Sequence, residues 1–166
     1  MNFNLDLLIT ILPFAFAIHN LEEVFGMEKW TSSIPHFIHK PVFTKQFTIA
    51  VGLFTILGFA LTLTRNYYQT ETQYLTVITA FSGMMFLNVF FPHLIATIYL
   101  KKYAPGIISG LIINLPLTIL ILLGIYHSQK LSSGQIFFYG FIGGLCGVAL
   151  AYIFLKIGKY FDPKAI

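Results

Sequence analysis

Long apolar segments, separated by short polar connections, repeat along this chain of 166 residues. A helix needs about 20 predominantly apolar residues to cross a hydrocarbon core of about 30 Å. The pattern predicts five membrane-spanning helices, which cover approximately residues 5–25, 46–65, 73–100, 104–126 and 134–157. Because the connections are short, consecutive helices should be antiparallel and form one all-α bundle, a single integral membrane domain over residues 1–166.

Composition strengthens the membrane assignment. The chain is 57% hydrophobic and only 10% charged, whereas a soluble domain carries about 25% charged residues. The N-terminus lacks the basic region of a cleaved signal peptide, so the first segment is expected to stay in the protein. A lone cysteine, Cys146, excludes an intramolecular disulfide. We expect a multi-pass protein of the cell membrane, surrounded by the lipid bilayer.

The distribution of basic residues predicts the orientation. Eight of the ten lysines and arginines follow the first, third and fifth segments, namely Lys29, Lys40, Lys45, Lys101, Lys102, Lys156, Lys159 and Lys164. Only Arg65 and Lys130 lie on the other side. The positive-inside rule then places the N-terminus outside and the C-terminus in the cytoplasm. Because the basic residues lie in short loops beside apolar segments, the net charge of +4 does not indicate nucleic-acid binding.

The connection over residues 26–45 is the longest. It mixes Trp30, Ile34 and Phe37 with basic side chains. This composition fits a segment that lies along the membrane surface. It also fits an ordinary aromatic belt with lysines that reach toward the headgroups.

Glycines spaced four residues apart indicate close helix packing, because they let two backbones approach each other in lipid. The pairs are Gly106 with Gly110, Gly140 with Gly144, and Gly143 with Gly147. They predict that the fourth and fifth helices cross closely. A homodimer that forms through the glycine-rich fifth helix is the alternative.

The most informative polar residues are His19, Glu22 and Glu23, in the first apolar segment. Ionisable groups inside a membrane are costly, and they mark functional sites by default. With about 100° of turn per residue, His19 projects roughly between the two glutamates, so all three can face one pocket. We predict a site here in the cytoplasmic leaflet.

Other polar residues reach a similar depth from other helices. His93 precedes Lys101 by about 12 Å of helix rise, and Asn88 lies deeper on the same segment. Pro92 is expected to bend the helix beside His93. Tyr103, Ala104, Pro105 and Gly106 follow on the same side of the membrane. These four residues begin the fourth predicted helix.

These residues carry a resemblance to a known family. His19, Glu22 and Glu23 match the pattern of the HXXEE-motif family of bacterial and archaeal membrane proteins. A Tyr-x-Pro-Gly motif of that family resembles residues 103–106, and its Asn and downstream His resemble Asn88 and His93. The resemblance covers approximately residues 10 to 155. It supports the site but implies no activity, because the family's function is described as unknown.

The residue types favour a metal centre. Neutral imidazoles and carboxylates suit divalent Zn, Fe or Mn, and His19, Glu22, Glu23 and His93 are the candidate ligands. Such a site can polarise a carbonyl or phosphoryl oxygen or activate water. We therefore expect a metal-dependent, hydrolase-like enzyme acting on a lipidic or amphipathic substrate, with Glu22 or Glu23 as the catalytic base.

Other interpretations stay open. Without a metal, paired carboxylates could move protons in an apolar substrate, as an isomerase does. The cluster could also act as a proton or ion relay in a transporter, or hold three helices together as a salt-bridge network.

Several polar residues are assigned weaker roles. Asn88, Tyr103 and Asn114 are candidates for substrate binding or for supporting the ligands, although the Asn114 amide more readily bonds backbone carbonyls freed by Pro116. Three further histidines are expected to be solvated or at a boundary. They are His36, His39 and His127.

Overall fold

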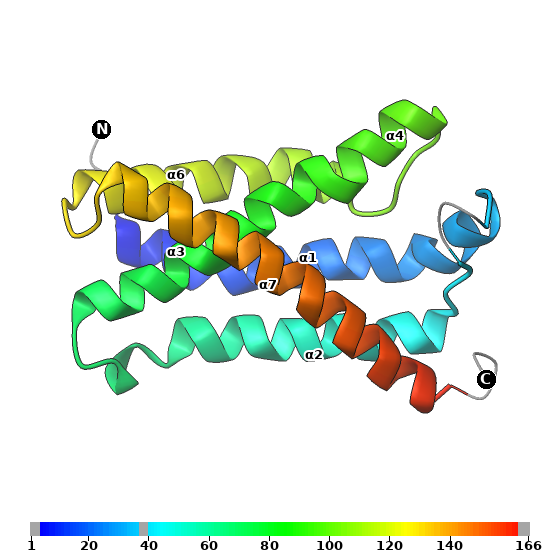
Figure 1. Cartoon of the computed structure of the whole chain (residues 1–166), viewed down its shortest axis with the longest axis horizontal. Helices are drawn as coiled ribbons and strands as arrows, with labels where there is room; N and C mark the ends of the chain where they lie inside the picture. Colours follow the sequence, from blue (N-terminus) through cyan, green and yellow to red (C-terminus); the bar gives the residue numbers. More distant parts are fainter. Residues whose placement is uncertain (1–3, 37–39, 163–166) are drawn as a thin grey trace.

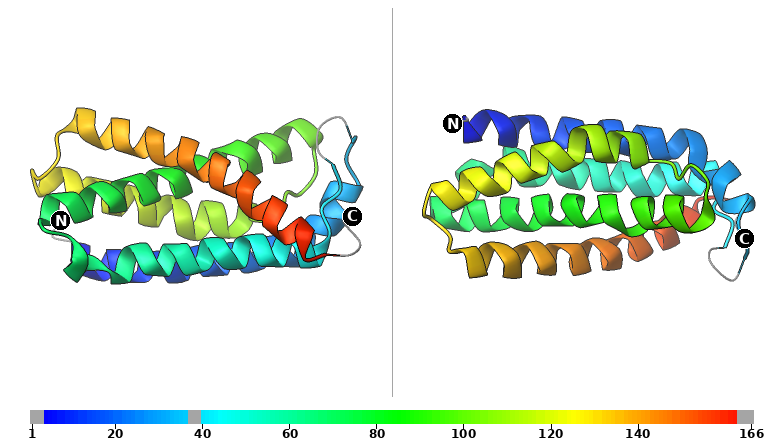
Figure 2. Two further views of the ribbon diagram at one scale, coloured as in Figure 1. Left: turned by 60° about the horizontal axis from the view of Figure 1, so that its bottom comes forward. Right: turned by 90° about the horizontal axis from the view of Figure 1, so that it is seen from above.

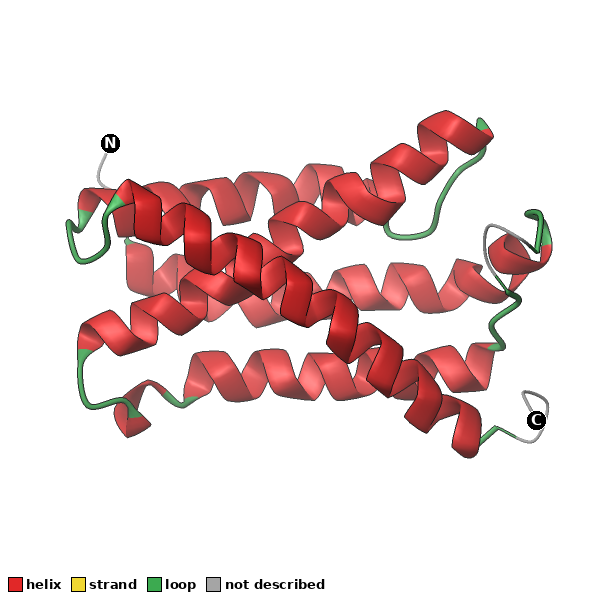
Figure 3. Ribbon diagram, in the orientation of Figure 1, coloured by secondary structure: helices red, strands yellow, loops and turns green. Residues whose placement is uncertain are grey.

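The computed structural model describes residues 4–36 and 40–162, and all regular structure within these ranges is helical (Figure 3). Five helical spans are long and apolar enough to cross a membrane. They lie side by side as an elongated bundle (Figure 1). The prediction of five membrane-spanning helices is confirmed at this level, and the protein is a multi-pass membrane protein.

Two of the five spans are interrupted by wider, π-helical turns. The helices are α1 (Leu5–Ser32), α2 (Thr44–Leu63), α3 (Glu71–Asn88), α4 (Ile95–Leu100), α5 (Ile107–Ser109), α6 (Leu115–His127) and α7 (Ser133–Tyr160). The π-helical segment η2 (Val89–Leu94) joins α3 to α4, and η3 (Gly110–Asn114) joins α5 to α6. The short 3₁₀ turn η1 (Arg65–Tyr67) precedes α3. Such π-helical turns are frequent at functional sites.

Side-chain caps define where the helices begin. Thr70 accepts a hydrogen bond from the backbone of Gln73, whose side chain reaches back to the Thr70 backbone. Ser132 and Gln135 form the same reciprocal arrangement at the start of α7. These capping boxes satisfy backbone donors that a helix start leaves without partners.

The first helix is longer than predicted. It continues past residue 25 to Ser32, because residues 26–32 contain no proline and Gly26 remains helical. The added turns hold the chain that follows: Glu28 accepts from the backbone of Thr44 at the start of α2 (2.7 Å), and Thr31 accepts from Val42 (3.1 Å). Trp30 therefore lies in a helix, not in a surface loop. Of the predicted surface segment, Phe37, Ile38 and His39 lie outside the described residues.

The bend expected at Pro92 is present. Phe91 has extended backbone angles (φ −130°, ψ 116°) inside η2. By contrast, the predicted start of the fourth helix at residue 104 is wrong, because Gly106 has φ +92° and the helix begins only at Ile107.

The close packing of glycines on the last helix involves a different partner from the one predicted. A Cβ atom on Gly143 would lie 1.9 Å from the Ala80 carbonyl oxygen, and one on Gly83 would lie 2.3 Å from the Gly140 Cα. Both contacts join α7 to α3. Figure 1 shows α7 crossing obliquely over α3 and α2, and the left view of Figure 2 shows the end of α7 beside α2. The predicted close crossing of the fourth and fifth helices is therefore wrong, and the glycine face of α7 lies inside the bundle.

The apolar core lies between α1, α3 and α6. Leu12, Ile78 and Ile121 are fully buried there, together with Met85 at 1% exposure. This core holds the three helices that carry the polar residues discussed below.

We predict that Gly143→Ala weakens the bundle. The new methyl group would meet backbone, which cannot move aside as a side chain can, so the free energy of unfolding should fall by about 1–3 kcal/mol. Thermal unfolding in detergent micelles measures the change. Gly52→Ala is the matched control, because nothing lies within 4 Å of the added atom. Equal stability of the two variants would contradict the assigned packing.

Candidate metal centre

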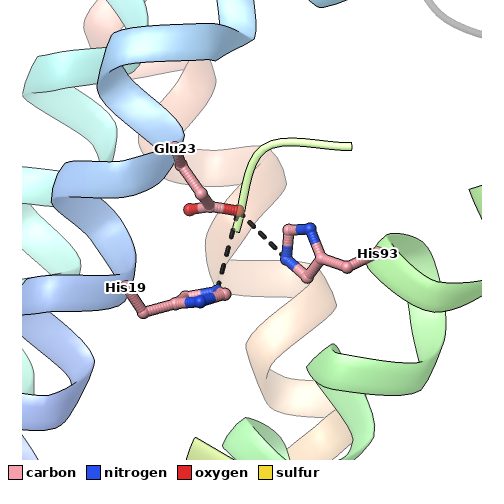
Figure 4. Close-up of side chains that lie close together, drawn as sticks. All are labelled: His19, Glu23 and His93. Atoms are coloured by element: carbon pink, nitrogen blue, oxygen red, sulfur yellow. Dashed lines mark ion pairs between the residues drawn. The ribbon is translucent and has the colours of Figure 1, made fainter. Parts of the chain in front are cut away.

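Two histidines and one glutamate meet in the interior of the bundle (Figure 4). His19 and Glu23 come from α1, and His93 comes from η2. Glu23 Oε1 lies 3.1 Å from His93 Nε2 and 3.8 Å from His19 Nε2. The three residues offer ligand atoms that all lie within 4.8 Å of one another. This group could hold a metal ion.

The group is almost shielded from solvent. His19 is 0% exposed, His93 2% and Glu23 8%. His19 stands midway along the 28-residue α1 rather than near its end, because the helix extends beyond the predicted boundary. A charged or strongly polar group is expensive at this depth unless it has a partner.

Asn88 completes the inner ring of polar atoms. Its Nδ2 lies 3.0 Å from His19 Nε2 and 3.1 Å from His93 Nε2. The Nε2 atom of each histidine therefore faces both Asn88 and Glu23. The structure thus places Asn88, a candidate for substrate binding or for supporting the ligands, beside both histidines.

The other nitrogen of His19 is held by a residue that the sequence analysis missed. His19 Nδ1 lies 3.1 Å from Ser109 Oγ, and the Ser109 hydroxyl donates to Glu22 Oε2. Because that hydroxyl gives its proton to the carboxylate, its lone pair is free to accept from Nδ1–H. This arrangement leaves the lone pair of Nε2 pointing into the centre, as a metal-binding histidine requires.

Glu22 is separated from the histidine cluster and supports the loop that covers it. Its two oxygens accept from the backbones of Gly106 (3.0 Å), Ile108 (3.1 Å) and Ser109 (2.7 Å). The hydroxyls of Ser109 and Tyr103 also donate to it. The sequence analysis placed both glutamates in one ligand set, but among the described residues only Glu23 joins the two histidines.

The position of Glu22 suits its charge. Its carboxylate lies at the N-terminus of the helical span Ile107–His127, where backbone N–H groups have no partners within the helix. The partial positive charge of a helix N-terminus also favours an anion there. The side chain thus satisfies donors that would otherwise be orphaned inside the protein.

Residues 101–106 form a loop that returns from the end of α4 to the centre (Figure 1). A Cβ atom on Gly106 would lie 2.8 Å from both His19 Cε1 and His93 Cε1, and 3.0 Å from Glu23 Cγ. With φ +92° as well, only glycine fits at this position. The sequence suggested that Gly106 belongs to a helix-packing pair. Instead, its backbone lies directly against His19, His93 and Glu23 and covers the centre.

A second contact fastens the same loop to α1. A Cβ atom on Gly26 would lie 2.7 Å from the Pro105 ring. Gly26 was missed as a site residue, although its spacing of four residues after Glu22 puts it on the same helix face. Ser109 carried a weaker signal, as a hydroxyl three residues after Gly106.

Tyr103 lies at the outer edge of the loop and is 49% exposed. Partial burial, and then the hydrogen bond to Glu22, raise the pKa of Tyr103 to about 12. The phenol thus stays protonated and keeps donating to Glu22 throughout the physiological pH range.

The remaining candidates lie apart from the centre. Asn114 is buried, and its Oδ1 has no hydrogen-bond partner within the described parts of the chain. The expected bond to a backbone carbonyl would come from the NH₂ group of Asn114, so this oxygen does not test it. His36 and His127 are exposed, and His39 lies outside the described residues.

The family model for a protein of unknown function with HXXEE motif matches residues 10–121. The chain belongs to the HXXEE family. An uncharacterized protein, YrkK of Bacillus subtilis (strain 168), is 30% identical over 150 residues, which cover 90% of this chain and 94% of that protein. No solved structure matches the chain significantly.

Membership in the HXXEE family gives the motif a structural meaning. In this member the His and the second Glu face His93, while the first Glu binds the loop that carries the Tyr-x-Pro-Gly sequence. The chemistry of the inner group, two imidazoles and one carboxylate, fits a divalent transition metal with at least one position left open.

We predict that Glu22→Ala destabilises the protein by about 2–4 kcal/mol, because five donors lose their charged acceptor. Glu22→Gln should cost less, since one oxygen remains. Thermal unfolding in micelles measures both. The control is Glu71→Gln, whose carboxylate makes exposed ion pairs with Arg65 and Lys130 worth at most about 1 kcal/mol. Glu22→Ala should therefore lower the free energy of unfolding clearly more than Glu71→Gln does. Equal losses in the two variants would show that the loop does not depend on Glu22.

The raised pKa of Tyr103 predicts a pH dependence. The folded protein retains the phenol proton up to about pH 12, whereas an unfolded tyrosine loses it near pH 10. The stabilisation by Tyr103 is thus complete below about pH 10 and is lost as the pH rises toward 12. Unfolding curves of wild type and Tyr103→Phe should converge over this range. A stability difference that does not change between pH 9 and pH 12 (roughly the span of the two pKa values) would refute the assignment.

Proposed function

We propose that this protein is a metal-dependent, hydrolase-like enzyme of the cell membrane that acts on a lipidic or amphipathic substrate. The observation that carries the proposal is the buried group of His19, Glu23 and His93, with ligand atoms within 4.8 Å of one another. Two helical segments supply these three residues, and Ser109 from a third segment orients the His19 ring. Three protein ligands with a fourth position open are typical of catalytic zinc sites, whereas structural sites are closed.

The residues in and around the centre have distinct roles in the proposed enzyme. His19, His93 and Glu23 would hold the metal, which supplies Lewis acidity for a carbonyl or phosphoryl oxygen when bound. Ser109, with Glu22 behind it, keeps His19 in the tautomer that presents Nε2 to the centre. Glu22 would act through this positioning and not as the base, because its oxygens already accept five hydrogen bonds.

The surroundings of the centre favour a lipidic substrate. Phe91 is 65% exposed beside His93, and Ile95 is 54% exposed one turn later. A separate apolar cleft of about 410 Å³ lies between α3, α6 and α7 and extends from Leu87 to Tyr126 and Ser133. A substrate with an acyl chain could occupy such apolar surface while its polar group approaches the centre. With the orientation that the basic loops favour, the loop of residues 101–106 faces the cytoplasmic side.

A proton relay is the second candidate, and one observation favours it. Polar atoms at 3.0 to 3.1 Å link Ser109, His19, Asn88, His93 and Glu23 without interruption. Chains of this kind move protons in membrane pumps and transporters. The relay needs no metal, so metal content separates the two candidates.

We predict that purified protein binds about one zinc, iron or manganese ion per chain, and that His19→Ala, His93→Ala and Glu23→Gln each weaken binding by about 100-fold or more. Elemental analysis and metal titration of the protein in micelles measure this. His127→Ala is the control, because that exposed histidine lies in α6 far along the chain from the cluster. If wild-type protein binds no metal but carries protons into liposomes, and Glu23→Gln abolishes this flux, the proton relay is correct and the enzyme proposal is wrong.

A further inference from the structure

We infer that Asn88 is a fourth metal ligand, through its side-chain oxygen. The inference rests on the proposed metal centre and adds a fourth protein ligand to it, so a substrate oxygen would bind as a fifth ligand, an expansion that catalytic zinc sites undergo. It follows from the distances among four side chains and from what each of their atoms can donate or accept.

With the Asn88 amide oriented as in the structure, His93 Nε2 faces one donor and one acceptor. It lies 3.1 Å from Asn88 Nδ2, a donor, and 3.1 Å from Glu23 Oε1, an acceptor. If this nitrogen carries a proton, the proton competes with the amide hydrogens of Asn88. If it carries none, its lone pair faces the carboxylate. With the amide in this orientation, either state leaves one neighbour opposed, and burial makes an opposed polar contact costly. An amide turned to present Oδ1 can accept from a protonated Nε2.

The amide partly relieves this conflict. An NH₂ group has two hydrogens, and Asn88 can direct one toward each imidazole, at 3.0 Å from His19 and 3.1 Å from His93. Its partial positive charge stands among two ring nitrogens and a carboxylate oxygen. A bound cation would occupy this place and attract the same three atoms more strongly.

A half-turn of the amide converts the donor into a ligand. The oxygen and nitrogen of an Asn side chain have nearly the same shape, so Oδ1 can take the position of Nδ2. Amide oxygens are ligands for divalent cations. Asn88 is half-buried and is followed by the π-helical segment η2, so its side chain is less confined than His19.

Four of the spacings among these side chains can be compared with those of a four-coordinate site. With metal–ligand distances of about 2.0–2.1 Å, neighbouring ligand atoms in a tetrahedral zinc site are about 3.3 Å apart. The corresponding distances here are 3.0 and 3.1 Å from Asn88 to the two histidines. From Glu23 to the histidines they are 3.1 and 3.8 Å.

A purely structural role for Asn88 predicts the opposite response to mutation. If Asn88 only donates to the histidines, it competes with the metal for the Nε2 lone pairs. Removing it would then strengthen metal binding. If Asn88 is a ligand, removing it weakens metal binding. The direction of the change therefore decides between the two roles.

The test is a titration of full-length protein in micelles with Co²⁺, followed by its visible absorption. We expect Asn88→Ala to bind Co²⁺ about tenfold or more weakly than wild type and to lose the strong absorption of four-coordinate cobalt. Asn20→Ala is the matched control, because Asn20 is a buried amide on α1 that bonds to Val51 and Thr55 outside the centre. It should bind Co²⁺ as wild type does.

A second measurement keeps the test valid if Asn88→Ala does not fold. The side-chain amide of Asn88 is followed in wild-type protein by ¹⁵N NMR, assigned as the signal absent from Asn88→Asp. We expect Zn²⁺ to shift this signal strongly and to remove its hydrogen bond to the imidazoles. Zn²⁺-saturated protein that retains this bond, or Asn88→Ala with unchanged or tighter Co²⁺ binding, overturns the inference while leaving the metal centre intact. Wild type that binds neither ion overturns both.

Discussion

The carboxylate of Glu22 is the constraint on which the interior of this protein depends. Lipid offers no hydrogen bonds, so non-helical backbone at membrane depth must find partners within the protein. Residues 101–106 bring such backbone to the level of His19, at the middle of α1. Glu22 accepts from three backbone N–H groups at the start of the span that follows this loop. Without it, the loop could not cover the centre and Ser109 could not hold His19.

The two adjacent glutamates consequently have different tasks. Neighbouring residues on a helix project about 100° apart, which directs Glu22 toward the loop and Glu23 toward His93. The separation also avoids placing two carboxylates against each other in a low-dielectric interior. One glutamate builds the site, and the other is left to interact with whatever the site binds.

Much of this arrangement could be predicted, for identifiable reasons. Apolar segment length predicted the five spans, and helical projection placed His19, Glu22 and Glu23 on one side of α1. Projection could not tell which glutamate meets His93, because that depends on the path of residues 101–106. Nor could spacing identify the partner of Gly143, since small residues show that a close contact exists but not with which helix. The extension of α1 to Ser32 was missed because Gly26, a residue typical of helix ends, is small here to admit Pro105.

The contact between Gly26 and Pro105 has an evolutionary consequence. The methyl group of an alanine at position 26 would lie 2.7 Å from the proline ring, so each residue restricts the other. Two motifs that lie about eighty residues apart in the sequence are thus joined at a point with no room for a side chain. A lineage that replaces the proline frees position 26 to vary, whereas one that keeps it must also keep the glycine. The two positions should therefore change together among related chains, and this covariation would trace the loop's docking without any structure.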